Sequence, residues 1–538
     1  MKVQIIVPMS GFGERFRSAG YKTPKPLIEV EGKPIIAHVI EMFPQETNFL
    51  FICNEDHLNN KKFNMRAIIK HFCPSGNIFA IKGHKLGPVN AIMNIREQVD
   101  HKLPTIINYC DFTCYWDWKK FKDFCKKSKC AGAIPAYKDF HPHSLGKTNY
   151  AYIKEKNNKV IDIQEKKPFT KNKLNEYASS GTYYFENASL MFSAFEYIIE
   201  KNYNVEGEYY VSMAYKYLIS INKLTLTYSL EHFMQWGTPE DLFEYNYWSN
   251  CFREMIDSRN IIKGKMKRGS VLVPMAGMGK RFSEEGYDNP KPLIKISNRP
   301  MVINAINDLP KADYYSFLSR KSMSANSMLK ENIKNNSKNL VISSIDKVTD
   351  GQATSAIICL TELKKRFKNK NIDPITIGVC DCGITYNHKK FEKVMNNDDI
   401  DLIVWSIRRY PNAIKYPKMY GWIKEKNNFI SEVSVKKPFD NDSDDPIIIG
   451  IFTFKKSLDF ENCYNSLRER KGRINNEYYI DSLIVDALKA GLKCYSFEVT
   501  SYLGWGTPND LKTFQYWHEC FAKWKGHPYS IKGSIKSY

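Results

Sequence analysis

The chain contains the same sequence pattern twice, and this repeat constrains its fold more than any other feature. Residues 5–36 read IIVPMSGFGERFRSAGYKTPKPLIEVEGKPII, and residues 271–302 read VLVPMAGMGKRFSEEGYDNPKPLIKISNRPMV, without a gap between them. Further matching segments follow in the same order in each half: YIKEKNN and WIKEKNN, then KKPF, EYY and WGTP in both. Solenoid repeats recur every 20–50 residues or so. A repeat of this length instead predicts a duplicated domain.

The repeat also predicts where the domains begin and end. The chain has 538 residues, which is more than one core usually serves, since domains commonly hold about 100–200 residues and some α/β units about 250. We expect a first domain over residues 1–255, a linker over 256–269, a second domain over 270–525 and a tail over 526–538. The densest basic run, Lys263 to Arg268, falls in this linker.

Short apolar runs alternate with helical patterns in each half. Apolar strands are predicted at 3–8, 49–53 and 105–109 in the first half and at 270–274 and 375–379 in the second; helices are predicted at 34–43, 87–99 and 351–367. This alternation predicts an α/β fold with a mostly parallel sheet covered on both faces. Ligands of such sheets bind at the carboxyl ends of the strands.

A glycine-rich turn follows the first strand of each half. Gly11 and Gly13 allow backbone N–H groups to approach phosphate oxygens closely, and Arg15 adds a bidentate donor. Lys25 follows between two prolines, which hold the backbone on either side of it. A tight turn without a ligand is the alternative, but the recurrence of the whole arrangement favours phosphate binding. The second half repeats it with Gly277, Gly279, Arg281 and Lys291.

One aspartate follows a predicted apolar strand in each half. Asp111 and Asp381 stand where Mg²⁺ could be held by one carboxylate and substrate phosphates; the alternative is a helix cap or a solvated loop. Farther along the chain, the lysine pairs 166–167 and 436–437 are candidates for a second phosphate group. Glu208 and Glu477 could accept hydrogen bonds from substrate hydroxyls or amines, or could equally be helix N-terminal acids.

At these motifs the chain resembles the superfamily of sugar nucleotidyltransferases, and more narrowly the capsule-associated members, including CTP-dependent cytidylyltransferases. The resemblance is carried by PMSGFGERF, GYKTPKPLI, VEGEYYVS and QWGTPEDL in the first half and by PMAGMGKRF, GYDNPKPLI, DGQATSAI, RINNEYYI and LGWGTPNDL in the second. It implies two tandem Rossmann-like domains of the GT-A type with mixed, mostly parallel sheets.

The resemblance also implies an activity. The phosphate of a sugar phosphate, or of another phosphorylated small molecule, attacks the α-phosphorus of an NTP and releases pyrophosphate, supplying an activated precursor for glycan or capsule-type synthesis. Such a displacement needs positioning and charge neutralisation more than covalent chemistry from the protein. CTP is the favoured NTP, and the resemblance also allows a bifunctional chain. The implied catalytic residues are Arg15, Lys25 and Lys167 in the first half and Arg281, Lys291 and Lys437 in the second. The resemblance implies that Mg²⁺ is held by Asp111 and Asp381 and that the acceptor is bound by Glu208 and Glu477. The nucleotide is expected to bind at Gly11, Gly13, Gly277, Gly279, Gly351 and Gln352.

The chain departs from the family pattern in three places, and the first two departures differ between the halves. The base-reading segment Gly351–Thr354 is intact in the second half, whereas the first half has GHKLGPV at 83–89. Glu165 precedes the lysine pair in the first half, and Val435 takes its place in the second. A second metal-binding Asp, expected two residues before the Gly-Thr step, is replaced by Gln235 and by Gly504.

The amino-acid composition of the chain indicates which kinds of molecule it can bind. Hydrophobic residues make up 43% and charged residues 25% of the chain, as in globular proteins. The net charge of +21 would suit a polyanion, but the lysines are dispersed. We therefore expect an NTP and a phosphorylated acceptor as partners, without nucleic acid. Thirteen scattered cysteines predict reduced thiols and a cytoplasmic location, and no run approaches the roughly 20 apolar residues of a membrane span.

Three other functions stay open at this point. A GT-A glycosyltransferase would usually carry a DxD motif, which Asp111-Phe-Thr and Asp381-Cys-Gly do not provide. One domain could be active and the other could be a regulatory nucleotide sensor, or both sites could have decayed into a scaffold. The sequence does not give the oligomeric state, although the two domains could pack as an internal pseudo-dimer.

Overall fold

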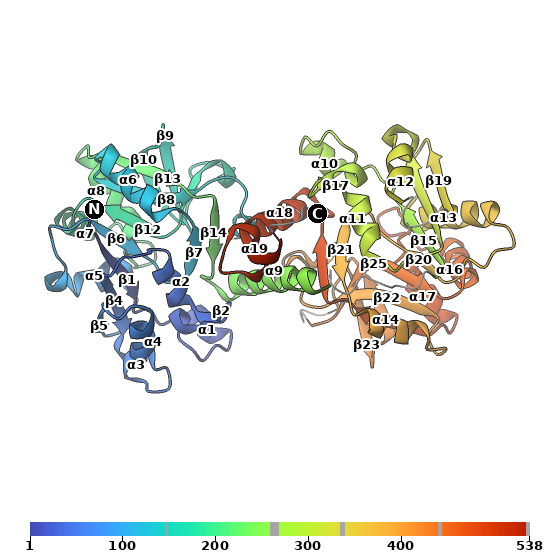
Figure 1. Ribbon diagram of the computed structural model, residues 1–538, viewed down its shortest axis with the longest axis horizontal. Helices are drawn as coiled ribbons and strands as arrows, with labels where there is room; N and C mark the ends of the chain where they lie inside the picture. Colours follow the sequence, from blue (N-terminus) through green and yellow to red (C-terminus); the bar gives the residue numbers. More distant parts are fainter. Residues whose placement is uncertain (147, 259–267, 334–338, 440–443, 534–538) are drawn as a thin grey trace. The chain divides into compact units, whose positions relative to one another are not determined.

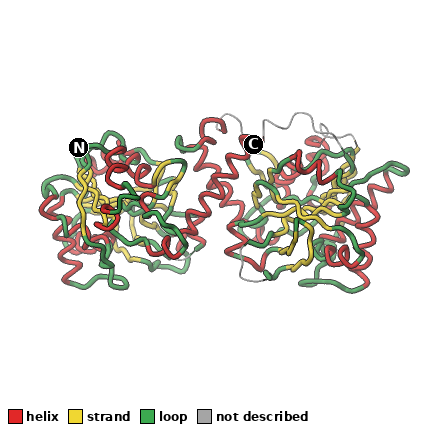
Figure 2. Tube along the Cα trace, turned by 90° about the horizontal axis from the view of Figure 1, so that it is seen from below, coloured by secondary structure: helices red, strands yellow, loops and turns green. Residues whose placement is uncertain are grey.

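Two buried aliphatic strands, one in each half, are the centres of two separate sheets. The computed structural model describes residues 1–146, 148–258, 268–333, 339–439 and 444–533. Its contacts divide the chain into two units, Met1–Asn246 and Tyr247–Tyr538. In each unit the strands lie in the interior and helices surround them (Figures 1 and 2). The α/β class is therefore confirmed.

The first unit contains a ten-stranded sheet. In spatial order its strands are β11 (Tyr177–Ser179), β9 (Ala151–Lys156), β10 (Lys159–Glu165), β13 (Thr225–Ser229), β8 (Gly132–Tyr137), β12 (Thr182–Phe185), β6 (Thr105–Asn108), β1 (Gln4–Met9), β4 (Phe49–Asn54) and β5 (Asn77–Ile81). Two small sheets join β2 (Glu29–Val30) to β3 (Lys33–Pro34) and β7 (Phe112–Tyr115) to β14 (His232–Gln235). The helices are α1 (Glu14–Ser18), α2 (Ile35–Glu41), α3 (Glu55–Asn59), α4 (Met65–Phe72), α5 (Pro88–Met93), α6 (Trp118–Ser128), α7 (Ala188–Glu200), α8 (Tyr215–Ser220) and the beginning of α9 (Pro239–Ser258).

The second unit contains a nine-stranded sheet. Its spatial order is β19 (Asn339–Ile345), β18 (Tyr314–Arg320), β15 (Ser270–Pro274), β20 (Ile375–Ile377), β25 (Ile447–Phe454), β22 (Leu402–Ile407), β26 (Cys494–Glu498), β24 (Phe429–Val435) and β23 (Gly421–Lys426). Two small sheets join β16 (Lys295–Ile296) to β17 (Arg299–Pro300) and β21 (Cys382–Thr385) to β27 (Ser501–Gly504). The helices are α10 (Lys280–Glu284), α11 (Met301–Asp308), α12 (Asn326–Ile333), α13 (Gln352–Arg366), α14 (His388–Met395), α15 (Pro411–Lys415), α16 (Ser457–Glu469), α17 (Leu483–Lys489), α18 (Pro508–Lys523) and α19 (Pro528–Gly533).

The two sheets have the same order of corresponding strands. Read from β5, the first sheet runs β5, β4, β1, β6, β12, β8, β13, β10, β9; the second runs β19, β18, β15, β20, β25, β22, β26, β24, β23. In both, the central strand pairs in parallel with its two neighbours. A strand in this position is covered on both faces, which explains why all six residues of β1 are buried.

The sheets are mixed, as expected, but their parallel part is smaller than predicted. The strands around β1 and β15 and the pairs β8–β13 and β22–β26 are parallel. The strands between them and the hairpins β9–β10 and β23–β24 pair antiparallel. The expectation of mostly parallel sheets fails there, because only two residues join the strands of each hairpin and no helix crosses between them.

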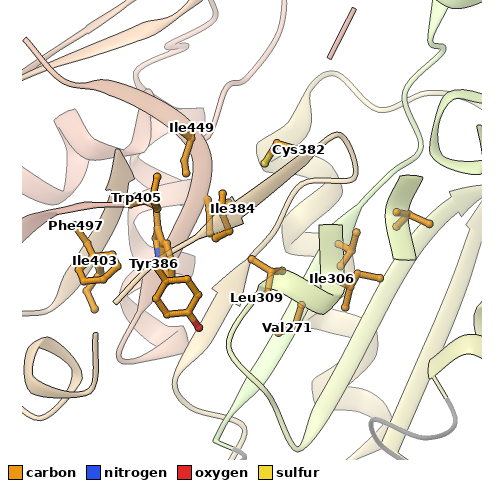
Figure 3. Packing of buried hydrophobic residues seen from close by; sticks show 14 of the residues in the cluster. Val271, Ile306, Leu309, Cys382, Ile384, Tyr386, Ile403, Trp405, Ile449 and Phe497 are labelled. Atoms are coloured by element: carbon orange, nitrogen blue, oxygen red, sulfur yellow. The ribbon is translucent and has the colours of Figure 1, made fainter. Parts of the chain in front are cut away.

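An aromatic cluster packs under the strand that follows Asp381. Trp405 on β22 lies 4.9 Å from Tyr386 and 5.0 Å from Phe497 between ring centroids, in edge-to-face geometry (Figure 3). Its indole N–H donates to the hydroxyl of Thr453 over 3.1 Å, so the ring is fixed as well as buried. This packing holds the end of β21 and, with it, the backbone on which Asp381 is placed.

The predicted linker and tail are partly helical. Residues 256–258 end α9, and residues 259–267 of the expected linker lie outside the described residues. Trp248 and Phe252 on α9 pack on Phe514 of α18, which places this part of the helix in the second unit. In the expected tail, His527 and Tyr529 are buried beside α19, while residues 534–538 lie outside the described residues. The helices at the predicted linker and tail are thus placed by the burial of aromatic side chains, which the repeat alone does not reveal.

We expect His527 to make the second unit sensitive to acid. Burial, together with the nearby charge of Arg253, lowers the pKa of His527 to about 3, while its ring contacts the hydroxyl of Ser249. The neutral ring contributes stability above the unfolded-state pKa of 6.5, and this contribution is lost as the pH falls below it. Between pH 7.5 and pH 5 it should lower the free energy of unfolding by about 2 kcal/mol.

Urea unfolding followed by tryptophan fluorescence at both pH values measures this loss. In His527→Gln, which has no titrating ring, the pH-dependent difference should shrink by about that amount. An equal acid sensitivity in both proteins would contradict the assignment.

Candidate nucleotide-binding and transfer sites

The glycine turns open helices at the carboxyl ends of the central strands. Gly13 and Gly279 adopt φ of 64° and 65° and cap α1 and α10. This left-handed conformation favours glycine. A Cβ on Gly11 or Gly277 would meet nothing within 4 Å, so these two glycines border open space. The turns thus leave backbone N–H groups accessible to an anion at a helix start.

The proline-flanked lysine of each unit reaches the strand-end aspartate. Lys25 Nζ lies 2.7 Å from Asp111 Oδ2, and Lys291 Nζ lies 2.5 Å from Asp381 Oδ2. In both pairs the lysine side chain is 20% exposed and the carboxylate 28%. Burial acts to lower the pKa of Lys291, but Asp381 outweighs it and the pKa is raised. In each unit a lysine–aspartate ion pair therefore lies beside the glycine turn.

The strand-end aspartates have room for a metal ion beside them. The backbone oxygen of Asp111 accepts a hydrogen bond from the N–H of Trp236, and that of Asp381 accepts one from Trp505. A Cβ on the next residue, Gly237 in the first unit, would lie only 3.4 Å from Asp111 Oδ2, so the glycine keeps this side of the carboxylate open.

The described residues contain no group of three or more His, Cys, Asp and Glu side chains suited to a metal ion. Mg²⁺ needs only one or two carboxylates when substrate phosphates complete its coordination. The single open carboxylate of each unit fits that chemistry.

A second carboxyl that sequence reasoning missed lies near Asp381. In the second unit, Asp510 at the start of α18 accepts hydrogen bonds from Thr507 and Asn412. Burial raises the pKa of Asp510, and Asp381 contributes to this. The WGTP motif carried the signal, because an acid three residues after a capping threonine forms a capping box.

The loop at Gly87 or Gly351, for which the family resemblance implies base reading, is closed in each unit by a backbone pairing with the Glu-Tyr-Tyr segment. Ala353 N–H donates to the oxygen of Tyr478 over 3.0 Å, and Val89 N–H donates to the oxygen of Tyr209 over 3.2 Å. A Cβ on Gly351, which has φ 143°, would lie 2.4 Å from the backbone of Tyr478. Glycine is therefore required at this contact.

Cavities bring most of the predicted site residues together in each unit. The first is about 250 Å³ in volume and is lined by Gly11, Gly13, Lys25, Asp111 and Glu208, together with His84 and Pro88. The second is about 580 Å³ and is lined by Gly277, Gly279, Lys291, Gly351, Gln352, Asp381 and Glu477. Gln352 begins α13, whereas Pro88 begins α5, so the first unit lacks the amide at this place.

The lysine pairs divide into one residue that faces the site and one that is exposed. Lys166 lies over the ring of Tyr210 at 5.0 Å, and Lys436 lies over Tyr479 at 5.5 Å. Lys167 and Lys437, the residues implied by the family resemblance, are exposed. The first lysine of each pair has a left-handed backbone, with φ of 57° and 62°.

The predicted arginines do not line the cavities, but their charges influence the pKa of a group next to each site. Arg15 and Arg281 are exposed on α1 and α10. Burial raises the pKa of Tyr210, and Arg15 opposes this. Burial lowers the pKa of Lys436, and Arg281 contributes to the lowering. Both arginines therefore lie on the side of the site where the first lysine of the pair is found.

Two further partly buried carboxyls were not predicted as site residues. Burial raises the pKa of Glu165 to about 7, although the hydroxyl of Ser212 donates to it over 2.5 Å. Burial raises the pKa of Asp481 to about 6, and Lys436 opposes this. Glu165 directly precedes the repeated KKPF motif and Asp481 closely follows the repeated Glu-Tyr-Tyr motif, but neither acid recurs in the other half, so the repeat pointed to neither of them.

Comparison with known proteins identifies the first unit. A family model described as nucleotidyl transferase matches residues 5–248. This part of the chain is a nucleotidyl transferase domain. The nucleotidyl transferase domain thus contains the glycine turn, the Lys25–Asp111 pair and the 250 Å³ cavity described above.

Curated relatives agree with the nucleotidyl transferase assignment. The chain is 26% identical over 283 residues to the bifunctional protein GlmU of Methanocaldococcus jannaschii, covering 52% of this chain and 60% of that protein. It is 23% identical over 271 residues to the bifunctional protein GlmU of Bacillus cereus strain AH187, covering 48% and 54%. The chain thus spans less than two thirds of the length of these relatives.

Solved structures are similar at low identity. The inositol-1-phosphate CTP transferase from T. maritima matches with a TM-score of 0.36 and 14% identity, covering 48% of this chain and 99% of that one. The nucleoside-diphosphate-sugar pyrophosphorylase from Vibrio cholerae RC9 matches with a TM-score of 0.37 and 19% identity, covering 44% and 98%. Among the described residues, no helix is long and apolar enough to cross a membrane.

Gly351→Ala should open the base-reading loop of the second unit. The new Cβ would meet the Tyr478 backbone at 2.4 Å, and a left-handed backbone is strained for any residue with a Cβ. We expect a loss of about 1–3 kcal/mol in the free energy of unfolding. Gly277→Ala is the matched control, because its Cβ would meet nothing within 4 Å. Urea denaturation of the two variants measures the difference, and equal stabilities would refute the close contact.

Proposed function

We propose that the chain is a nucleotidyltransferase with two transfer sites. Each site joins the NMP part of an NTP to the phosphate of a sugar phosphate or another phosphorylated small molecule and releases pyrophosphate. The Lys–Asp pair over the glycine turn carries this proposal, because it recurs in both units at 2.7 and 2.5 Å with equal exposure. The nucleotidyl transferase domain at residues 5–248 and the GlmU relatives support it.

The residues around each cavity match the charges of the reaction. The N–H groups of the glycine turn and Lys25 or Lys291 receive the triphosphate, and the arginine on the following helix adds a bidentate cation. In the transition state negative charge spreads over the phosphate oxygens, so fixed cations stabilise it more than the ground state. Mg²⁺ bound at Asp111 or Asp381 would neutralise further charge on these oxygens.

The acceptor binds on the side of Lys166 or Lys436. One of its phosphate oxygens attacks the α-phosphorus, a new P–O bond forms, and the bond from the α-phosphorus to the bridging oxygen of pyrophosphate breaks. The protein holds the two reactants in line and needs no covalent intermediate. Glu208 and Glu477 line the cavities and can accept hydrogen bonds from hydroxyls or amines of the acceptor.

CTP is the NTP we favour for the second unit. Gln352 lines its cavity, and its side-chain amide offers both a donor and an acceptor. Cytosine presents an amino donor beside a ring-nitrogen acceptor, so one amide can pair with both. The first unit has Pro88 at this place, which favours a different base or a regulatory nucleotide there. We further propose that the product is an activated precursor for glycan or capsule-type synthesis in the cytoplasm.

Pyrophosphate release tests the proposed activity. The purified chain is incubated with Mg²⁺, each NTP and a panel of sugar phosphates and other phosphorylated small molecules. We expect at least one pair of substrates to release pyrophosphate, and Lys25→Ala and Lys291→Ala each to lower one activity by at least about 100-fold, as loss of a transition-state cation does. Release by neither site with any pair would reject the proposal. Loss through Lys291→Ala alone would assign the first unit a regulatory role.

The metal dependence has its own test. Chelation of Mg²⁺ should abolish release, and Asp381→Asn should raise the Mg²⁺ concentration needed for half-maximal release in the second unit by roughly tenfold or more, because a carboxylate ligand becomes a neutral amide. Asp401→Asn, at the backbone entry to β22, is a control that removes a charge elsewhere. An unchanged Mg²⁺ requirement in Asp381→Asn would contradict the role of this residue.

A further inference from the structure

Backbone hydrogen bonds hold the chain on both sides of Gln352. Tyr478 N–H donates to the backbone oxygen of Asp350 over 2.9 Å, and Ala353 N–H donates to the oxygen of Tyr478 over 3.0 Å. The backbone that carries Gln352 is thus joined to one residue, Tyr478, both before and after it. The residue before Tyr478, Glu477, lines the same cavity as Gln352. A group that fixes Tyr478 to this loop therefore acts on two segments of the second site.

The carboxylate of Asp350 lies at the centre of a network around this pairing. Its Oδ2 accepts hydrogen bonds from Arg468 and, over 3.2 Å, from Arg473, and its Oδ1 accepts one from the hydroxyl of Thr354 over 2.5 Å. Thr354 lies in the first turn of α13, Arg468 lies on α16, and Arg473 lies in the connection after α16. The carboxylate thus joins the loop to its own helix and to a segment 118 residues away.

Both arginines also lie over the ring of Tyr478. The Cζ atom of Arg468 is 4.6 Å from the ring centroid, and that of Arg473 is 4.8 Å from it, within the roughly 6 Å over which an aromatic ring attracts a cation. The tyrosine itself is buried. Asp350, the two arginines and Tyr478 therefore form a closed circuit of contacts, in which the backbone bond from Tyr478 to Asp350 is one side.

The network is charged and partly open to solvent. Burial acts to raise the pKa of Asp350, but the hydrogen bonds from Thr354 and Arg468 and the charge of Arg473 outweigh it, and the pKa is lowered. A single ion pair between exposed side chains contributes little to stability. Here one carboxylate serves two guanidinium groups that a buried ring also holds in place, and such networks are stronger than isolated pairs.

The first unit keeps the backbone pairing but has none of the charged groups. Tyr209 N–H donates to the oxygen of Leu86 over 3.0 Å, so Leu86 takes the place of the aspartate, and its side chain is exposed. Counted back from the Glu-Tyr-Tyr segment, Ile199 and Asn204 take the places of the two arginines. The acid and both arginines thus occur together in one unit, and all three are replaced by uncharged residues in the other.

The loop of the first unit is attached to a different element. Lys85 Nζ lies 2.7 Å from a carboxylate oxygen of Glu14 on α1, and both side chains are largely exposed. The second unit has Thr349 and Lys280 at these positions, which cannot form an ion pair; the hydroxyl of Thr349 donates to the backbone oxygen of Gly351 over 2.9 Å instead. One loop is therefore joined to the helix after the glycine turn, and the other to α16 and the connection after it.

We propose that Asp350 is a positioning residue of the second site, which acts through Arg468 and Arg473 to hold Gln352 in place for reading the base of the nucleotide. A side-chain amide offers a donor and an acceptor whose order is reversed when the amide turns over, so discrimination between bases requires a fixed backbone beneath it. A loop that is held before the ligand arrives also loses less conformational freedom on binding. Base reading by Gln352 rests on the proposed function, whereas the hold on the loop does not.

The hold on the loop is tested without any substrate. Hydrogen–deuterium exchange of the full chain, followed by mass spectrometry, reports on the amide groups of residues 349–356. Asp350→Asn keeps the shape of the side chain and removes its charge, and we expect exchange of this segment to become about three- to tenfold faster because the charged hydrogen bonds are weakened. Asp346→Asn is the matched control, since it removes a nearby acid whose partner is the exposed Lys321, and it should leave the exchange rate unchanged.

Variants of the arginines test whether Asp350 acts through them. Arg468→Gln combined with Arg473→Gln should accelerate exchange of the same segment about as much as Asp350→Asn, and adding Asp350→Asn should change little further, because effects within one network are not additive. Fully additive effects would overturn the proposed route. If circular dichroism shows that the triple variant does not fold, Asp350→Asn with Arg468→Gln provides the same comparison.

The pyrophosphate assay tests the role in base reading. With the first site silenced by Lys25→Ala, Asp350→Asn should raise KM for the preferred NTP about three- to tenfold and lower its preference over the other NTPs, measured as the ratio of kcat/KM values, by a similar factor. KM for the acceptor should stay within twofold. A fall in kcat with KM and NTP preference unchanged would indicate a merely structural role and overturn the proposal.

The two experiments separate this proposal from the proposed function. An unchanged exchange rate of residues 349–356 in Asp350→Asn overturns the hold on the loop, whatever the enzymatic activity. A chain that releases no pyrophosphate with any substrate rejects the proposed function, and with it base reading by Gln352, while the exchange rates still decide whether Asp350 and the arginines hold the loop.

Discussion

The ion pair between the proline-flanked lysine and the strand-end aspartate joins the separate parts of each site. The aspartate lies on the backbone that leaves the sheet after β6 or β20, and the lysine lies on the chain that returns from the glycine turn, 86 or 90 residues away. Both side chains are partly exposed, and such pairs contribute only about 1 kcal/mol or less. In the proposed reaction, the triphosphate replaces the aspartate as the partner of the lysine, and the carboxylate then becomes available to a metal ion. The ion pair therefore holds the two segments of the site together and still leaves the site accessible to a ligand.

Much of this arrangement follows from the sequence because it depends on short-range rules. The buried strand β1 needs mostly apolar side chains, the turn at Gly13 has a positive φ that favours glycine, and a lysine between two prolines has a stiff backbone. The carboxyl ends of neighbouring parallel strands meet at one edge, so Asp111 and the glycine turn are expected at the same edge of the sheet. The repeat then transfers each of these arguments to the second unit.

The parts that could not be predicted depend on contacts between distant segments or on a single dihedral angle. The positive φ of Lys166 and Lys436 turns the first lysine of each pair toward the site and leaves Lys167 and Lys437 exposed. The end of α9 and the helix α19 have no counterpart in the repeated motifs, and aromatic packing on Phe514 and around Tyr529 decides their place. Asp481 has no acid at the equivalent position of the first half, so comparing the halves residue by residue does not reveal it.

The difference between the halves at Glu165 and Asp481 bears on whether both sites are used. A site that decays loses charged groups one at a time, because an unpaired buried carboxyl is costly and nothing selects for its replacement. Here the acid that is missing at Val435 is matched by Asp481, and a Cβ on Gly421 would lie only 2.5 Å from the Asp481 carboxylate. Each copy thus keeps one carboxyl whose pKa is raised by burial, Glu165 or Asp481. The difference between Gln352 and Pro88 in the base-reading loops then agrees better with two sites that read different nucleotides than with the decay of one of them.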